Sequence, residues 1–214
     1  MPVPWNDDRS ADRPRIRDNL QHLLTDLVEE APRRRPPSIS RLRQWHRRIY
    51  EGAQLPVSYY AGGIRDSDPD EPELFGYDVI VGRFRGVDHA HVPEELALFE
   101  DALREAVGRL DSRLPPESTP ADEGLLHSVV VLAAAAHGEL VRIHPFANGN
   151  GRVARLLANW CLLRYGLPPV VRLKPRPEGN EYVRAAEASM EGDHQPMVQL
   201  VLAMLGDWLR HEDR

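Results

Sequence analysis

The chain has 214 residues, a length that fits one full-sized domain, or one domain with a short appendage, better than two independent domains. Hydrophobic residues make up 42% of it and charged residues 28%, which is the balance of a soluble globular protein rather than of a disordered or membrane chain. The formal net charge of -6 argues against general affinity for nucleic acid, which depends on cationic side chains facing phosphates, so no nucleic-acid partner is expected.

The first part of the chain predicts an arm, a helix and a linker. Residues 1–14 are rich in Pro, Asp and Arg, have no apolar period and predict a loose arm. They also lack the apolar stretch of a secretory signal, so we expect a cytoplasmic protein. Apolar residues at helical spacing predict an amphipathic helix over 16–30, and the Pro- and Arg-rich stretch after it indicates a linker. We therefore separate 1–37 from a domain over 38–214.

The next segment predicts a helix followed by a small β-ribbon. Ser38 and Ser40 are both suitable N-caps for a helix that ends at Gly52. Short β-branched runs then appear among Pro, Gly and Asp. The stretch YDVIVGRFRGV, residues 77–87, predicts two strands that turn near Gly82.

The rest of the chain is predicted to be helical, over 93–110, 124–142, 150–165, 179–191 and 195–212. The nearly all-apolar segment 124–142 lacks a polar face and should be buried in the middle of the domain. Its apolar run is too short and too polar to span a bilayer, so no membrane partner is expected. Cys161, the single cysteine, excludes an intramolecular disulfide and any cysteine-based zinc cluster, and indicates core packing. The predicted fold class is all-α with one β-ribbon.

The loop between two of these helices collects groups that suit phosphate chemistry. Gly149 and Gly151 stand where a helix begins, so they allow unusual backbone conformations and leave amide N–H groups that attract anions. Arg152 and Arg155 fall on adjacent parts of one helix face and add planar donors. His144 precedes the loop and can act as a general base near neutral pH. Glycines alone would indicate only a helix entry, but the combination predicts a polyphosphate site.

The stretch HPFANGNGRVAR resembles the Fic motif H-x-F-x-[D/E]-G-N-G-R-x-x-R. The matching residues are His144, Phe146, Gly149, Asn150, Gly151, Arg152 and Arg155. Residues 46–65 resemble the upstream Fic segment with its H-x-x-[I/L]-[F/Y]-E and A-G-x-x-R elements. Residues 181–198 resemble the downstream Tyr-containing helix and the G-D-x-x-P connection. The resemblance covers about 38–205 and implies a Fic/Fido helical core with a β-hairpin flap above the motif at 144–155.

The resemblance also implies a protein adenylyltransferase (AMPylase), which moves AMP or another nucleoside monophosphate from ATP onto a Ser, Thr or Tyr hydroxyl of a protein. His144 would deprotonate that hydroxyl, and Phe146 would anchor the loop in the core. The anion hole would come from Gly149, Asn150 and Gly151, with Arg152 on the β-phosphate and Arg155 on the γ-phosphate. The flap at 77–87 would bind the target protein by strand addition. Tyr182 either contacts the nucleoside or is a packing aromatic.

Asn148 departs from the family pattern, because most active members carry an acidic residue there that holds magnesium. Mg²⁺ prefers hard, anionic oxygen ligands, and an amide offers a neutral one. The sequence therefore predicts Asn148 as a weak Mg²⁺ ligand, and the resemblance implies ATP as co-substrate. It leaves three functions open: nucleotidyl transfer, kinase-like transfer of another phosphate-containing group as in the related Doc toxins, and non-catalytic nucleotide binding by a regulatory module.

Many Fic proteins are inhibited by a helix with the pattern [S/T]-x-x-x-E-[G/N], whose glutamate pairs with the second arginine of the motif. TDLVEE, residues 25–30, lies on a predicted helix but ends in Glu30 instead of Gly or Asn. TPADEG, residues 119–124, matches the letters but lies in a predicted loop, which favours chance. The resulting hypothesis is a pairing of Glu29 with Arg155. A separate antitoxin or a homodimer is the alternative.

The other histidines and the tryptophans are expected to be structural. His89 and His91 favour a solvated loop over a metal pair, because no further ligand lies near them in the sequence. His127 and His137 are expected in the core or next to the site, and His46 either supports the site or packs elsewhere. Three tryptophans on apolar helix faces are expected in the core: Trp45, Trp160 and Trp208.

Overall fold

The computed structural model describes residues 3–7, 9–173, 175, 177 and 179–212. The α-helices of this part are α1 (Arg13–Glu30), α2 (Ile39–Ile49), α3 (Val92–Arg113), α4 (Glu123–Ile143), α5 (Asn150–Arg164), α6 (Asn180–Met190) and α7 (Gln195–Glu212). They are joined by the short 3-10 helices η1 (Ala31–Arg33), η2 (Ser58–Tyr60), η3 (Pro72–Leu74) and η4 (His89–His91) and by the strands β1 (Ile80–Val81) and β2 (Phe84–Arg85). The predicted fold class, all-α with one small β-ribbon, is confirmed.

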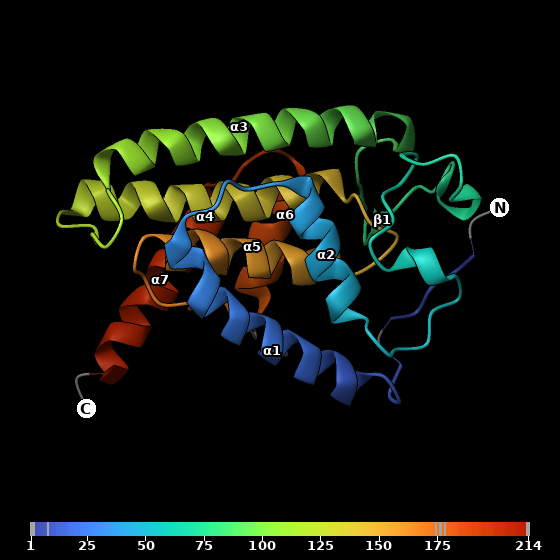
Figure 1. Ribbon diagram of the computed structural model, residues 1–214, viewed down its shortest axis with the longest axis horizontal. Coiled ribbons are helices and arrows are strands. Elements are labelled where there is room, and N and C mark those ends of the chain that lie inside the picture. Colours follow the sequence, from blue (N-terminus) through green and yellow to red (C-terminus); the bar gives the residue numbers. More distant parts are fainter. Residues whose placement is uncertain (1–2, 8, 174, 176, 178, 213–214) are drawn as a thin grey trace.

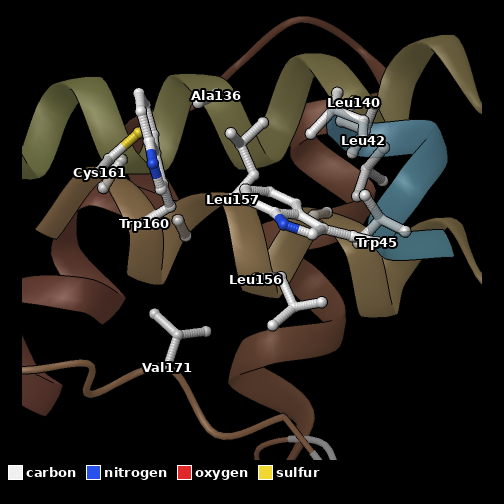
Figure 2. Close-up of a cluster of buried hydrophobic side chains, with 14 of the residues drawn as sticks. Leu42, Trp45, Ala136, Leu140, Leu156, Leu157, Trp160, Cys161 and Val171 are labelled. Carbon is white, nitrogen blue, oxygen red and sulfur yellow. The ribbon is translucent and has the colours of Figure 1, made fainter. Parts of the chain in front are cut away.

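Helices α4 and α5 form the centre of the domain. Residues on every side of α4 are buried, as its lack of a polar face predicts. Helix α3 covers one side of α4 and α5 covers another, while α6 and α7 also pack against α4 (Figure 1). Figure 2 shows a cluster of this core, to which α2, α4 and α5 contribute Trp45, Leu140 and Trp160 among others. This packing fixes both ends of the loop between α4 and α5.

The start of the chain packs into the same core. Ile16, Leu20 and Leu27 of α1 are buried, and α1 contacts both α2 and α5. The prediction of a loose arm over 1–14 is wrong in the described residues, because Trp5 is buried and α1 already begins at Arg13. A single aromatic anchor has no periodicity, so the sequence pattern could not reveal it.

Local signals set the starts of two helices. Ser38, rather than Ser40, caps α2, because its hydroxyl accepts from the N–H of Arg41 at 3.3 Å. The carboxylate of Asp122 caps α4 by accepting from the N–H of Leu125 at 2.8 Å. By length and composition alone, α4 is also the one helix of the described residues that could cross a membrane. However, 56% of its most apolar window is buried inside the domain.

The small sheet is a hairpin that projects over the end of α4. Ile80 pairs with Arg85 and Val81 with Phe84, and the chain turns at Gly82, whose φ of +61° favours glycine. The N–H of Val87 donates to the carbonyl of Arg142 at 3.2 Å and ties the hairpin to the end of α4. Ile80 is 70% exposed and Val81 45% exposed, so the outer part of the hairpin does not contribute to the core.

Candidate active site

His144 is the C-cap residue that follows α4. Its backbone is left-handed (φ 51°, ψ 59°), which turns the chain out of the helix. Its Nδ1 contacts the carbonyl oxygen of Val141, and since a carbonyl only accepts, Nδ1 carries the hydrogen and Nε2 keeps the lone pair. Burial lowers the pKa of His144 to about 4, although the bond to Val141 opposes this shift. The ring is therefore neutral near pH 7 and able to accept a proton at Nε2.

The loop after His144 is closed by the side chain of Asn150. Its Oδ1 accepts from the N–H of Phe146 and its Nδ2 donates to the carbonyl of Phe146, both at 2.9 Å. Phe146 is 1% exposed, which places it in the core as expected. Gly149 has a φ of +76°, and a Cβ there would lie 2.3 Å from the hydroxyl of Tyr50. The asparagine at position 150 and the glycine at position 149 therefore allow the loop to close into this compact turn.

The start of α5 supplies backbone amides to the motif loop. The amides of Asn150 and Gly151 lie in the first turn, and no backbone acceptor among the described residues takes them. Such amides and the helix dipole favour an anion. The expectation of an unusual backbone conformation is wrong for Gly151, which is helical. Its lack of a side chain matters instead because a Cβ would lie 3.3 Å from Nη1 of Arg155.

His46 supports the loop from α2 and is fully buried. Its Nδ1 accepts from the N–H of Gly62 at 2.8 Å, so Nε2 carries the hydrogen and donates to the carbonyl of Asn148 at 2.9 Å. Its ring also stacks on Phe146 with centroids 4.0 Å apart. Of the two positions left open by the sequence, the structure places His46 against the site.

Arg65 links the loop to the hairpin and is also fully buried. Its guanidinium donates to the carbonyls of Ile143 and His144, at 2.8 and 2.7 Å. It also donates to the carbonyls of Tyr77 and Val87, which lie before and after the hairpin, at 2.9 and 3.0 Å. Burial lowers its pKa to about 10, so it stays charged at neutral pH. The sequence contained this residue only as the last position of the A-G-x-x-R element.

The first arginine of the motif, Arg152, is held by the start of the chain. Its Nη1 forms an ion pair with the carboxylate of Asp7 and donates to the hydroxyl of Tyr50 at 2.8 Å. The side chains of Arg152 and Asp7 are only 13% and 9% exposed. Asp7 was not identified from the sequence, because nothing in the arm marks one aspartate among several.

The second arginine, Arg155, is anchored from two directions and is buried. Its Nε and Nη2 donate to the carbonyl of Leu173 at 3.2 and 3.0 Å, and its Nη1 donates to the hydroxyl of Tyr182 at 3.0 Å. The same hydroxyl lies 2.9 Å from Nε2 of His137, a buried residue of α4. Since a guanidinium has five N–H groups, two remain for a ligand. Tyr182 thus positions Arg155 as well as lining the site.

Replacing Tyr182 with phenylalanine should lower the free energy of unfolding by about 1–3 kcal/mol, because a buried hydrogen-bonding group of His137 and one of Arg155 would lose their partner. Urea unfolding at neutral pH measures this loss. Tyr59→Phe is the matched control: its hydroxyl accepts only a long bond of 3.4 Å from Glu73, so a small change is expected. Equal losses in both variants would contradict the assigned role.

Most of the motif residues meet at one open cleft of about 1160 Å³. The lining residues from the motif and from α6 include His144, Asn148, Gly149, Asn150, Gly151, Arg152, Arg155 and Tyr182. The hairpin contributes 78–81 to one wall, and α1 contributes Arg13 and Arg17 to another. The sequence predicted the motif and the hairpin at this site but not the two arginines of α1. Phe146, by contrast, lies beneath the loop.

Asn148 is engaged by other protein groups. Its Oδ1 accepts from the N–H of Gly149 at 2.8 Å, and its Nδ2 donates to the carbonyl of Trp5 at 3.0 Å. Among the described residues, no group of three or more His, Cys, Asp or Glu side chains is placed to hold a metal ion. The carboxylates near the cleft are also paired, Asp7 with Arg152 and Asp78 with Arg85. Both polar atoms of the Asn148 side chain are therefore already bonded within the protein, and its role as a Mg²⁺ ligand stays a prediction.

The predictions for residues outside the loop are confirmed in some cases and wrong in others. Glu29 is exposed on α1 and makes no ion pair with Arg155, so the structure does not bring this hypothetical pair together. His127 is exposed rather than in the core, whereas His137 is buried beside the site. His89 contacts the carboxylate of Asp66 next to the hairpin. Trp45 and Trp160 are buried as expected, but Trp208 is only half-buried.

Three buried histidines, His46, His137 and His144, make the stability depend on pH, and the pKa shift is largest for the first two. Burial lowers the pKa of His46 and of His137 to about 3 from an ordinary value of 6.5. Between these values the unfolded chain binds protons that the folded chain does not, so stability is retained above pH 6.5 and falls as the pH drops towards 3. We expect a loss of roughly 1 kcal/mol per pH unit for each histidine, measured by urea unfolding between about pH 7 and about pH 5.

The comparison variants are His137→Asn and His22→Asn. The slope of stability against pH should be shallower in His137→Asn, because one titrating buried group is gone. His22 is exposed on α1, so its replacement should leave the slope unchanged. Identical slopes in all three proteins would show that buried histidines do not cause the acid sensitivity.

The chain is similar to known proteins in sequence and in fold. The protein adenylyltransferase fic-1 of Caenorhabditis elegans is 35% identical over 164 residues, which are 77% of this chain but 26% of that protein. The chain thus spans about a quarter of the length of this curated relative. A Fic-domain signaling protein from Bacteroides thetaiotaomicron has a similar fold, with a TM-score of 0.66 and 22% identity over 94% of this chain and 72% of that chain.

A further structure of similar fold is the BepC protein of Bartonella tribocorum, a VirB-translocated effector solved with bound AMPPNP. Its TM-score is 0.57, with 18% identity over 87% of this chain and 84% of that chain. The family model described as Fic/DOC matches residues 36–162, a range that contains Arg65, His46 and the whole loop. With the motif residues assembled at one cleft as described, the chain belongs to the Fic/DOC family.

Proposed function

We propose that this protein is an adenylyltransferase that moves AMP from ATP onto a Ser, Thr or Tyr hydroxyl of a protein. The observation that carries the proposal is the position of His144, whose neutral Nε2 has a lone pair, at the same cleft as the α5 amides and Arg155. The relatives named protein adenylyltransferases and the AMPPNP bound by a protein of similar fold support ATP as the donor. The alternative donor chemistry is transfer of the terminal phosphate.

The transfer step needs a base, an anion site and little else from the protein. The target hydroxyl gives its proton to Nε2 of His144, and its oxygen forms a bond to the α-phosphorus. The bond between that phosphorus and the bridging oxygen breaks, and pyrophosphate leaves with the electron pair. The amides of Asn150 and Gly151 and the remaining N–H groups of Arg155 suit the negative charge of the polyphosphate.

The hairpin is the proposed docking point for the target protein. Its strands are only two residues long each, and Ile80 and Val81 are exposed while also lining the cleft. An extended segment of the target can therefore pair with the hairpin edge and bring its hydroxyl to His144. The conclusion on target class rests on this edge and on the family.

The experiment is a parallel incubation of the purified protein with cell lysate and ATP labelled at either the α- or the γ-phosphate. His144→Ala is incubated alongside. Labelling of protein from the α-position only, lost in the variant, is the expected result. Labelling from the γ-position only would replace the proposal with a kinase-like activity. If neither label is transferred, the proposal fails under these conditions.

A further inference from the structure

A short segment, Val3–Asp7, crosses the outside of the motif loop, and we call it the strap. Tyr60 binds its start, because the hydroxyl accepts from the N–H of Val3 at 2.9 Å and donates to the carbonyl of Val3 at 3.0 Å. Trp5 then packs against the rings of Tyr50 and Tyr60, with centroids 4.6 and 5.8 Å away. In Figure 1 the start of the chain runs along the end of the molecule that carries β1 before it enters α1.

The end of the strap places a carboxylate on Arg152. Asp7 contacts both Nη1 of Arg152 and the hydroxyl of Tyr50, and its side chain is 9% exposed. A guanidinium binds carboxylate and phosphate oxygens with the same geometry. While this ion pair is formed, a phosphate oxygen cannot bind Nη1 of Arg152. The strap therefore supplies its own anion to Arg152, a cation that lines the cleft together with the α5 amides and Arg155 of the proposed polyphosphate site.

The amide of Asn148 holds the middle of the strap. Its Nδ2 donates to the carbonyl of Trp5 at 3.0 Å, between the two anchors at Tyr60 and Arg152. A carboxylate at position 148 would have no hydrogen to donate and would meet that carbonyl with negative charge. The departure from the acidic residue of the motif is thus explained by a contact within this chain. Asn148 fixes the strap and leaves no carboxylate for a metal.

We propose that the strap is an autoinhibitory element, in which Asp7 competes with the polyphosphate for Arg152 and Asn148 fastens the competing segment. This inference rests on the proposed function, because it takes a nucleotide polyphosphate as the competing ligand. A nucleotide binds fully only when the strap leaves, so the apparent affinity is reduced by the fraction of molecules whose strap is closed. Weakening the strap raises that affinity.

The test measures ATP binding by calorimetry for the wild type, Asp7→Asn and Trp5→Ala, in EDTA so that no metal contributes. Asp7→Asn should bind ATP about tenfold more tightly, as expected when a charge-assisted contact of the competitor is lost. Trp5→Ala changes no charge and should also bind more tightly, which separates strap release from simple removal of negative charge. Asp101→Asn, an exposed position on α3, is the control and should match the wild type.

A direct measurement accompanies the binding assay. Amide hydrogen exchange of the peptide that contains the strap should rise when the wild type is saturated with ATP, because the segment leaves the loop. Unchanged or weaker ATP binding by both variants, or protection of the strap by ATP, would overturn the inference and indicate that Asp7 positions Arg152 for the ligand. If both variants bind ATP more tightly but no AMP is transferred, the inference about the strap holds and only the proposed function fails. Absence of ATP binding in every variant would remove both.

Discussion

Replacement of His144 by alanine is expected to lower the rate of AMP transfer at least about a hundred-fold, which is the usual contribution of a positioned general base. The variant should still bind ATP within about twofold of the wild type, because the phosphate donors are on α5 and not on His144. Initial rates of label transfer from ATP and calorimetric ATP binding, measured on the same preparations, separate these two effects.

The control for this prediction is His127→Ala. His127 lies on the same helix, α4, but is exposed and far from the lining of the cleft, so its replacement should change neither rate nor affinity. If His144→Ala transfers AMP as fast as the wild type, the base is another group or none. Loss of ATP binding together with transfer would instead show that His144 shapes the nucleotide site.

The largest effect on stability is expected for Arg65→Leu. The guanidinium donates to carbonyls on both sides of the loop and of the hairpin, and the side chain is fully buried. Leucine would leave these acceptors without a donor inside the protein, so a loss of about 3 kcal/mol or more in the free energy of unfolding is expected. Urea unfolding measures the loss.

Two further variants test whether the loss of stability comes from the buried hydrogen bonds of Arg65. Lysine at position 65 keeps the charge but has one donor nitrogen, so Arg65→Lys should recover only part of the stability. Arg109 forms an exposed pair with Glu105 at 2.5 Å, and Arg109→Leu should change stability by less than about 1 kcal/mol. Comparable losses for Arg65→Leu and Arg109→Leu would contradict a special role for Arg65.

The parts that could be predicted from the sequence depend on local patterns. The helices could be predicted because apolar residues at a regular spacing are a signal that lies within a short stretch of sequence. The loop could be predicted because His144, Gly149, Arg152 and Arg155 follow one another within a few residues, so their relative positions depend little on the rest of the fold. The hairpin was predicted for the same reason, from a turn at Gly82 between two β-branched runs.

The parts that could not be predicted depend on contacts between distant residues. Asp7 and Arg152 are separated by 145 positions, and no pattern near Asp7 distinguishes it from its acidic neighbours. Tyr182 and His137 are 45 positions apart on different helices, so their contact follows from the packing of α6 on α4. The role of Asn148 became visible only with Trp5 beside it. Long-range pairing of polar groups is therefore what the structure adds.

The central claim is that this cleft transfers AMP to a protein hydroxyl with His144 as the base. The most direct test is peptide mass spectrometry of lysate proteins after incubation with ATP and the wild type, Asp7→Asn or His144→Ala. We predict AMP adducts on Ser, Thr or Tyr residues with the wild type, more of them with Asp7→Asn, and none with His144→Ala. Phosphate adducts in place of AMP, or equal AMP adducts with His144→Ala, would contradict the account.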